Sequence, residues 1–373
     1  MPGKSAAARQ SLARIETAIL GVFTAAGFEQ IAPDILQPAD IFLERSGEDI
    51  RNRTYVFADP SGAEMCLRPD LTVPACRYHL SHAASAQAEA RYCYSGPVFR
   101  FADETNGANE TVQTGVEWLG GGDAERAEAD VLRLACASVE AAGLTHYRVL
   151  TGDLGLFRAL IDDFEIPERW RRRLKHHFWR PQAFRDLLAS ISGDAIRLRT
   201  SISAHVDAIA AGEGAGFVIR KFADEGHALQ GGRTVEEITA RLMEKAADRS
   251  ERPLSRAEAQ RIQDYLAIAG SPAEAAAAFT ALDHGKRFAA ATERFVRRAE
   301  LLTGAQHFAA IFGRSLEYYT GFVFQIEADG PEGPVQVAGG GRYDDLLSDI
   351  GAPLPVPAVG CAVFPERIAG LSP

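Results

Sequence analysis

Gln113 and Glu117 are polar side chains whose spacing could hold a small ligand. Residues 112–119 (VQTGVEWL) are typical of a β-strand, in which positions 113, 115 and 117 share one face because side chains alternate. Gly115 lies between the two polar positions and should leave room above the sheet. This pattern suits a polar ligand lying on the sheet. By themselves, however, the residues favour an ordinary exposed polar face.

A second candidate set lies near the C-terminal end. Tyr318 and Tyr319 are adjacent, so we expect their rings to face opposite ways, and only one need be part of the core. Two ordinary β-forming residues would give the same pattern. Arg314 could hold a carboxylate through a forked, charge-assisted pair. Gly321 and the glycines at 339–341 permit tight turns and close backbone approach.

Composition limits the class of protein. The chain has 373 residues, 46% of them hydrophobic, and a formal net charge of −10. The acidic surface disfavours nucleic acid as the main partner. The five cysteines have neither disulfide nor zinc-site spacing. The start has no signal-peptide pattern and no apolar run is long enough to span a bilayer, so we expect a cytoplasmic protein without a membrane partner.

The elements that must position these residues follow from periodicity and turns. An amphipathic helix is predicted over 5–27, ending at Gly27. Hairpin signals connect 54–58 with 64–67, and 91–101 with 112–119. A helix over 124–142 and a strand over 146–151 follow. The pattern indicates an antiparallel sheet in the N-terminal third.

Residues 154–300 differ in composition from the rest of the chain, with Ala-rich and Arg-rich stretches. These stretches predict a mostly helical insertion in which the arginines lie on solvated helix faces. Strands are predicted again at 308–312, 322–327, 335–338 and 359–363, with a short helix over 343–350. The fold class is therefore α+β, with helices flanking an antiparallel sheet. We expect 1–153 and 301–373 to form the core and 154–300 to be inserted into it.

Four segments, in order, resemble class II histidyl-tRNA synthetases. Residues 67–72 (LRPDLT) are similar to that family's LRPEgT, and 96–100 (GPVFR), continuing to Gln113 and Glu117, is similar to class II motif 2. Residues 314–321 (RSLEYYTG) resemble RGLDYYTG, and 338–344 (AGGGRYD) resemble AGGRYD. Their order, and their coverage of roughly residues 5–370, make the resemblance specific. It implies a class II synthetase-like core.

The resemblance also implies a pocket for free histidine. Positions matching Asp70, Thr72, Gln113 and Glu117 hold the ammonium group in that family, and the tyrosines contact the imidazole. Asp70 replaces the family's glutamate and has a shorter reach. The expected histidine-binding residues are Asp70, Thr72, Arg100, Gln113, Glu117, Arg314, Tyr318 and Tyr319. No catalytic residue, cofactor or metal ligand is expected.

The chain departs from the synthetases where they bind ATP. Basic positions of the motif 2 loop are Ala108 and Glu110 here, and a carboxylate near a triphosphate weakens binding. Arg367 matches the arginine that stacks on adenine, but Phe364 replaces a glycine and should occlude part of that pocket. Pro373 follows six residues after Arg367, so we expect no anticodon-binding domain.

A histidine pocket that is largely present, a damaged ATP site and the expected lack of a tRNA-binding domain resemble one group of paralogues, the regulatory subunits of ATP phosphoribosyltransferase. Similarity to them implies a protein that is inactive alone. It would form a homodimer within a hetero-octamer, activate the short-form catalytic subunit and mediate feedback by histidine, its effector, in the first step of histidine biosynthesis. Histidine could occupy the old pocket or a subunit interface. The alternatives are a truncated histidyl-tRNA synthetase-like enzyme that activates histidine, and a stand-alone histidine-binding protein.

Overall fold

The structure is a computed structural model that describes residues 3–45, 52–102, 108–178, 180–192, 248, 251–282, 285–302, 306–313 and 318–371. The chain folds as two compact units. The first comprises Met1–Asp163 with Tyr265–Pro373, and the second comprises Phe164–Asp264. Among the described residues, no helix is long and apolar enough to cross a membrane.

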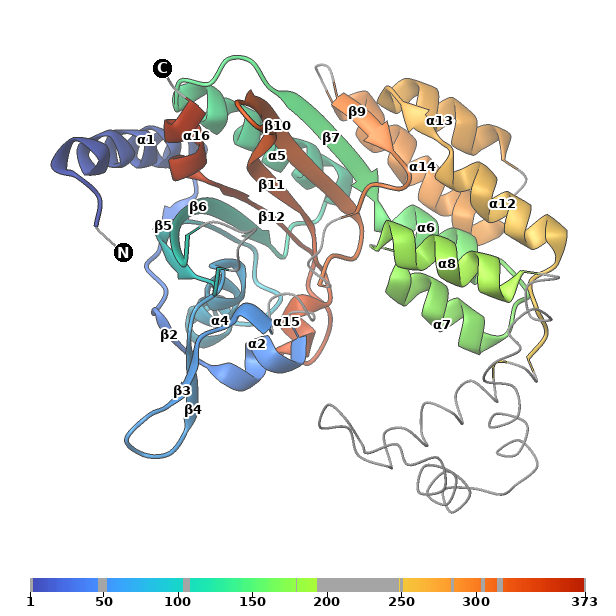
Figure 1. Cartoon of the computed structure of the whole chain (residues 1–373), viewed down its shortest axis with the longest axis horizontal. Helices are drawn as coiled ribbons and strands as arrows, with labels where there is room; N and C mark the ends of the chain where they lie inside the picture. The colour runs from blue at the N-terminus through green and yellow to red at the C-terminus, as the bar shows by residue number, and fades with distance from the viewer. Residues whose placement is uncertain are drawn as a thin grey trace, which may run out of the picture. The chain divides into compact units, whose positions relative to one another are not determined.

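Both parts of the first unit contain helices and strands (Figure 1). The helices of the chain are α1 (Ala6–Ala25), α2 (Ala39–Arg45), α4 (Thr72–His82), α5 (Ala124–Ala141), α6 (Leu154–Asp162), α7 (Glu168–His177), α8 (Pro181–Ile191), α12 (Arg256–Leu266), α13 (Pro272–Ala281), α14 (Lys286–Leu301), α15 (Leu346–Asp349) and α16 (Pro365–Leu371). The strands are β1 (Glu29–Gln30), β2 (Leu36–Pro38), β3 (Val56–Ala58), β4 (Glu64–Leu67), β5 (Ala90–Phe99), β6 (Glu110–Leu119), β7 (Arg148–Asp153), β8 (Ala269–Gly270), β9 (Gln306–Ala309), β10 (Phe322–Gly330), β11 (Gly333–Arg342) and β12 (Ala358–Val363).

A nine-stranded sheet with the order β1-β5-β6-β12-β11-β10-β7-β9-β8 forms the centre of the first unit. The predicted α+β class and the two hairpins are confirmed, but the sheet is not wholly antiparallel. β1 runs parallel to β5, and β7 runs parallel to β9. The second of these pairs is possible because a long helical connection returns the chain to the same end of the sheet.

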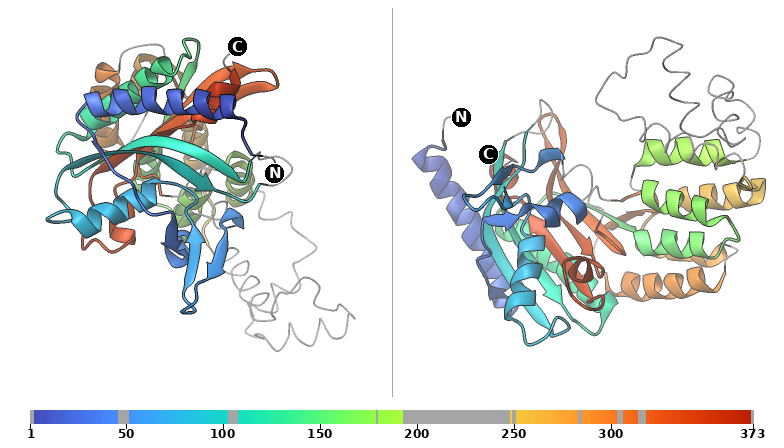
Figure 2. Two further views of the ribbon diagram at one scale, coloured as in Figure 1. Left: turned by 90° about the vertical axis from the view of Figure 1, so that its left-hand side faces the viewer. Right: turned by 90° about the horizontal axis from the view of Figure 1, so that it is seen from below.

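Helices α1, α5 and α16 cover one face of this sheet (Figure 2). Helix α1 packs there because Ile15, Ile19 and Phe23 recur at helical spacing and are buried. The Ser5 side chain accepts a hydrogen bond from the backbone N–H of Ala8 at the start of α1. Gly27, at φ +85°, follows the helix as predicted, because glycine adopts this left-handed conformation without strain.

The other face of the sheet carries α4, α15 and a small three-stranded sheet, β2-β4-β3 (Figure 2). The predicted helix over 343–350 is shorter than expected, since α15 begins only at Leu346. The preceding residues are tied to the sheet instead. Tyr343 donates from its backbone N–H to the carbonyl oxygen of Ala358, and Asp344 donates to the hydroxyl of Thr320.

The predicted helical segment 154–300 divides between the two units instead of forming one insertion. Tyr265 packs its ring against Phe279 and Phe288, and Phe279 packs against Phe295 and Phe308. This aromatic cluster joins α13 and α14 to β9. Because these rings bury together, α6, α13 and α14 belong to the first unit, and only Phe164–Asp264 forms the second.

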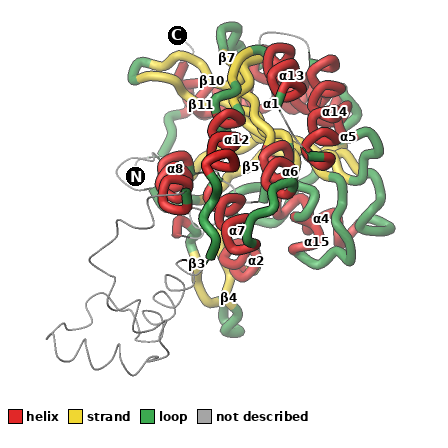
Figure 3. The backbone as a smooth tube through the Cα atoms, turned by 90° about the vertical axis from the view of Figure 1, so that its right-hand side faces the viewer, coloured by secondary structure: helices red, strands yellow, loops and turns green. Residues whose placement is uncertain are grey.

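The described part of the second unit is mainly helical, as the red tube in Figure 3 illustrates. The arginines of α7 were expected to form a solvated helix face, but some of them contact other residues of the unit. Arg173 forms an ion pair with Asp248 at 2.6 Å, and Arg171 donates to the carbonyl oxygen of Phe164 at 3.0 Å. The indole of Trp170 is buried and donates to the carbonyl oxygen of Arg252 at 2.8 Å.

Candidate functional site

A cavity of about 100 Å³ lies in the first unit, between the start of α4 and the face of the sheet formed by β6, β11 and β12. Six of the eight predicted site residues meet there, from three distant parts of the sequence. The cavity is lined by Asp70, Thr72, Arg100, Gln113, Tyr318, Tyr319, Gln336, Gly339, Tyr343, Gly360, Cys361, Ala362, Phe364 and Arg367.

Asp70 provides a buried acceptor without a partner. Its side chain is 3% exposed, and Oδ1 accepts a hydrogen bond from the backbone N–H of Val73 at 3.1 Å. Oδ2 is buried and has no hydrogen-bond partner. Burial raises the pKa of Asp70, whereas the nearby Arg100 lowers it. Because an unsatisfied buried carboxylate oxygen is costly, this oxygen is suited to accept hydrogen bonds from a cationic ligand.

Glu117 does not line the cavity but lies buried beside it. Its carboxylate accepts a hydrogen bond from the Tyr94 hydroxyl at 2.7 Å and another from the Tyr343 hydroxyl. Thr72 also hydrogen-bonds to this carboxyl group. A side chain at the neighbouring Gly360 would collide with the Glu117 carboxylate, so the glycine keeps the two strands together. Burial raises the pKa of Glu117 to about 7, against the hydrogen bonds from the two tyrosines, which lower it.

The space above Gly115 is not open to a ligand, contrary to the prediction from the strand pattern. A side chain at 115 would collide first with the carbonyl oxygen of Cys361 and then with the ring and hydroxyl of Tyr94, the partner of Gly115 in the β5–β6 register. The glycine therefore makes room for Tyr94, which reaches the Glu117 carboxylate. Gln113 lines the cavity two residues away and is buried.

The two adjacent tyrosines do not face opposite ways. Tyr318 and Tyr319 both line the cavity and are both buried, with their ring centroids 4.8 Å apart and their planes at 52°. They lie in a turn before β10, where strand alternation does not apply. Tyr343 completes the wall, with its ring centroid 5.8 Å from that of Tyr318. Three phenols thus surround a space that could accept a planar, hydrogen-bonding ring.

Two arginines border the cavity. Arg100 donates from Nε to the carbonyl oxygen of Pro69 at 2.7 Å. Arg367 donates from Nη1 to the carbonyl oxygen of Gln336 at 2.9 Å, and its guanidinium carbon lies 4.4 Å from the centroid of the Phe364 ring. The Phe364 ring therefore lies against the Arg367 guanidinium group, on a side where a planar ligand could otherwise stack.

Arg314, the remaining predicted site residue, lies outside the described residues, as do the motif residues 315–317. Sequence reasoning did not assign Tyr94, Tyr343 or Gln336 to the site. Tyr343 had a signal, since it belongs to the AGGGRYD segment. Tyr94 and Gln336 had none apart from their places on strands. The described residues contain no cluster of His, Cys, Asp or Glu that could hold a metal ion.

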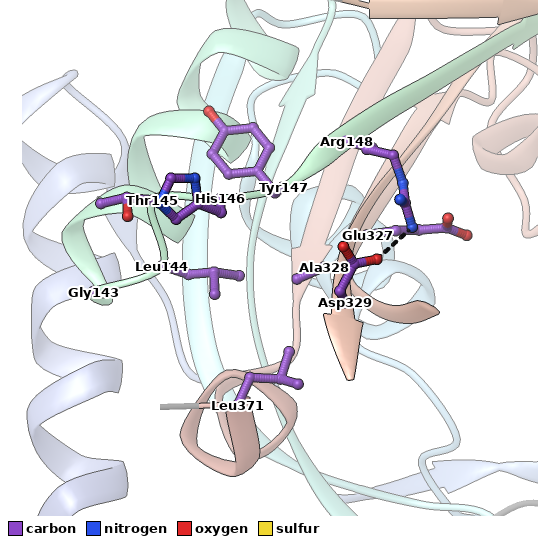
Figure 4. Close-up of a pocket in the computed structure, with 10 residues that line it drawn as sticks. All are labelled: Gly143, Leu144, Thr145, His146, Tyr147, Arg148, Glu327, Ala328, Asp329 and Leu371. Atoms are coloured by element: carbon purple, nitrogen blue, oxygen red, sulfur yellow. Dashed lines mark hydrogen bonds and ion pairs between the residues drawn. The ribbon is translucent and has the colours of Figure 1, made fainter. Parts of the chain in front are cut away.

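A larger hollow of about 550 Å³ lies between the end of α5, the start of β7 and the end of β10 (Figure 4). Arg148 and Asp329 form an ion pair across it at 2.8 Å, and both side chains are largely exposed. Leu144, Ala328 and Leu371 give it an apolar side. It has no buried polar atom without a partner, so the smaller cavity is the better candidate for specific ligand binding.

The fold and the site define a histidyl-tRNA synthetase-like protein of class II. The family model described as histidyl-tRNA synthetase matches residues 5–195 and 228–368. A structure titled ATP phosphoribosyltransferase regulatory subunit/histidyl-tRNA synthetase, from Bacillus halodurans, has a TM-score of 0.69 at 21% identity and covers 100% of this chain and 82% of its own. A histidine–tRNA ligase subunit from Alicyclobacillus acidocaldarius has a TM-score of 0.58 at 24% identity, covering 100% and 95%. These likenesses confirm the predicted fold.

Curated relatives narrow the class further. The ATP phosphoribosyltransferase regulatory subunit of Mesorhizobium japonicum is 35% identical over 95% of this chain and 96% of its own length. That of Chelativorans sp. is also 35% identical, over 90% and 91%. The chain belongs to the family of ATP phosphoribosyltransferase regulatory subunits. The prediction of a regulatory subunit in place of a catalytic enzyme is thereby confirmed.

Proposed function

We propose that this chain activates the short-form catalytic subunit of ATP phosphoribosyltransferase and lowers that activity when free histidine occupies the cavity. The observation that carries this proposal is the unpartnered carboxylate oxygen of Asp70 in a cavity walled by three tyrosines. A buried acceptor of this kind suits an ammonium group, and the phenols suit an imidazole. The same elements support histidine over an apolar amino acid.

Each part of histidine has a complementary group in this arrangement. The ammonium group would bind Asp70, with Thr72 and Gln113 as neutral acceptors. The carboxylate would pair with Arg100, which can offer a planar fork. The imidazole would lie among Tyr318, Tyr319 and Tyr343. Glu117 would not make the direct contact with the ligand ammonium group that the sequence resemblance implied. It would instead hold Tyr343 in place by accepting the hydrogen bond from its hydroxyl.

The regulatory effect requires that histidine prefers one of two states of the complex. A ligand shifts such an equilibrium only by its difference in affinity for the two states. We propose that the state in which the cavity is closed around histidine is the one in which the catalytic subunit is less active. Binding at a subunit interface is the alternative location. It predicts that substitutions in the cavity leave feedback unchanged.

The enzyme alternative, activation of histidine with ATP, has less support. Phe364 covers Arg367, the arginine that would otherwise stack on adenine. We therefore expect no histidine-dependent exchange of pyrophosphate into ATP. Robust exchange by the purified chain would overturn the regulatory proposal in favour of an enzyme.

The partner is proposed to be the short-form catalytic subunit, in a hetero-octamer built on homodimers of this chain. Among the described residues, five of the six exposed large apolar side chains gather on or beside the three-stranded sheet. They are Ile35, Leu36, Val56, Phe57 and Phe101. An apolar group of this kind is typical of a protein interface, and we assign it to the second copy of this chain. The five cysteines are thiols and form no disulfide, which is compatible with the reducing cytoplasm that we propose.

The deciding experiment measures phosphoribosyl transfer by the cognate catalytic subunit with and without this chain, across a histidine titration. Activity should appear only in the mixture and should fall as histidine rises. The variant Asp70→Asn should keep the activation but lose the feedback, because the amide cannot neutralise an ammonium group. An unchanged catalytic rate in the mixture, or unchanged feedback in Asp70→Asn, would contradict the proposal.

A further inference from the structure

On the helix side of the sheet, away from the cavity, four buried charged side chains form a chain of alternating sign. Asp153 Oδ2 accepts from Arg298 Nη2 at 2.5 Å, and Arg298 Nη1 donates to Glu128 Oε2 at 2.7 Å. The other oxygen of Glu128 accepts from Nε of Arg342. The four side chains are buried, at 6%, 4%, 3% and 7% exposure in the order Asp153, Arg298, Glu128 and Arg342.

Each member of this ion chain belongs to a different element. Asp153 ends β7 and caps α6, where Oδ1 accepts from the backbone N–H of Gly155 at 2.8 Å. Arg298 lies in the last turn of α14, Glu128 lies on α5, and Arg342 ends β11. Burial would lower the pKa of Arg298, but Asp153 and Glu128 outweigh burial and raise it. Because uncompensated buried charge is so costly, the four groups must keep their mutual geometry.

Arg342 connects the ion chain to the segment that carries Tyr343. Its Nη1 donates to Asp344 Oδ1 at 2.8 Å, and the same oxygen accepts from the backbone N–H of Ala358 at 2.8 Å. Its Nη2 donates to the carbonyl oxygen of Ala124, in the first turn of α5, at 2.9 Å. The guanidinium group thus links Asp344, which follows Tyr343, to the start of α5.

Tyr343 projects to the opposite side of the sheet, into the cavity wall. Its hydroxyl donates to Glu117, and its ring lies edge-on to Tyr318. Neighbouring residues at the end of a strand point to opposite faces, so a shift of Arg342 on the helix side must move Tyr343 on the cavity side. The hydrogen-bond partners of the Arg342 side chain are Glu128, Asp344 and the carbonyl oxygen of Ala124, and none of these three residues lines the cavity. Arg342 is joined to the cavity wall through its peptide bond to Tyr343.

We propose that Arg342 is a positioning residue for the cavity, and that the ion chain Asp153–Arg298–Glu128–Arg342 ties the geometry of the cavity to helices α5 and α14. The proposal rests on the proposed function only in taking histidine as the ligand. Arg342 fixes the position of the Tyr343 hydroxyl on Glu117, and through it the wall that meets the ligand. A displacement of α5 relative to α14 would therefore move the wall of the cavity at Tyr343.

The test compares Arg342→Met, Arg342→Lys and Tyr343→Phe in the full-length chain. Histidine affinity is measured by calorimetry, and the titration of the Glu117 carboxyl group is followed by carbon NMR without ligand, with assignment from Glu117→Gln. Arg297→Gln is the matched control. Arg297 also joins α14 to α5, by pairing with Glu125 at 3.0 Å, but it is largely exposed and outside the ion chain.

Arg342→Met should weaken histidine binding at least about tenfold, because a displaced Tyr343 would no longer meet the imidazole. It should also raise the titration midpoint of Glu117, because the hydrogen bond from Tyr343 favours the ionised carboxylate. Arg342→Lys should fall between the wild type and the methionine variant, since lysine keeps the charge but cannot fork to three acceptors. Combining Arg342→Lys with Tyr343→Phe should weaken binding no further than Tyr343→Phe alone.

Two results would overturn the positioning role. One is a folded Arg342→Met variant with wild-type histidine affinity and an unchanged Glu117 midpoint. The other is additive effects in the double variant, which would mean that Arg342 acts independently of Tyr343. If the methionine variant does not fold, the lysine variant decides by the same readouts. If the wild-type chain does not bind histidine, the proposed function fails, whereas the Glu117 midpoint still decides the role of Arg342.

Discussion

Replacing Glu117 by glutamine should remove one contribution to the pH dependence of folding, in the range between about pH 4.5 and 7. The carboxyl group has a pKa of about 7 in the folded chain, raised by burial from an ordinary 4.5. Between these values the folded state binds more protons than the unfolded state, so the free energy of unfolding falls as the pH rises. The stabilising difference is complete below 4.5 and is lost once the pH passes 7. The interval of about 2.5 pH units, at about 1.4 kcal/mol each, amounts to about 3.5 kcal/mol.

Urea unfolding of the wild type and of Glu117→Gln, followed by circular dichroism at several pH values, measures this difference. Near pH 5 the two proteins should be of similar stability, because the neutral acid and the amide have similar shape and polarity. Near pH 8 the variant should be more stable by up to about 3.5 kcal/mol, because only the wild type has a buried carboxyl group that must ionise there. Glu110→Gln is the control, since Glu110 starts the same strand but is exposed.

The reasoning would be refuted if the wild type and Glu117→Gln changed in parallel with pH. Parallel curves would mean that the carboxyl group titrates with an ordinary pKa, and hence that the hydrogen bonds from Tyr94 and Tyr343 fully offset its burial. A variant that is less stable at every pH would point instead to a requirement for the anion. In that case Glu117 would be held ionised in the folded protein.

Three further predictions concern other parts of the molecule. Phe364→Gly should strengthen ATP binding at least about tenfold, measured by calorimetry, because it uncovers Arg367; no gain would contradict occlusion by the phenyl ring. Arg298→Met should lower the free energy of unfolding by about 3–5 kcal/mol in urea, because it leaves the carboxylates of Glu128 and Asp153 buried without their partner; a loss below about 1 kcal/mol would argue against a tightly held ion chain. Leu36→Glu should weaken self-association at least about tenfold by light scattering, since the charge enters an exposed apolar group; an unchanged mass would place the interface elsewhere.

The fold, and the convergence of several predicted residues on one cavity, were predictable because they depend on local pattern and on motif order. Helix α1 follows from the spacing of its apolar residues and from Gly27. The cavity residues Asp70, Gln113 and Tyr318 could be brought together because each belongs to a motif with a known place in a related fold. These inferences required no knowledge of side-chain packing.

The remaining features depend on register and packing, which spacing does not reveal. Tyr94 fills the space above Gly115 because β5 and β6 pair with these residues opposite each other. Tyr319 faces the same cavity as Tyr318 because the chain turns there, so strand alternation failed as a guide. The second unit, Phe164–Asp264, is shorter than the expected insertion 154–300, since the aromatic cluster around Phe279 joins residues that are far apart in the sequence.

The contact between Phe364 and Arg367 bears on whether the chain can bind ATP as well as histidine. ATP is a substrate of the reaction that this family regulates, and it is abundant whether or not histidine is needed. The state of a regulator that still bound ATP would depend on the ATP concentration as well as on the histidine concentration. Under the proposed function, the aromatic ring that the chain places against the arginine would let it respond to histidine without also binding ATP.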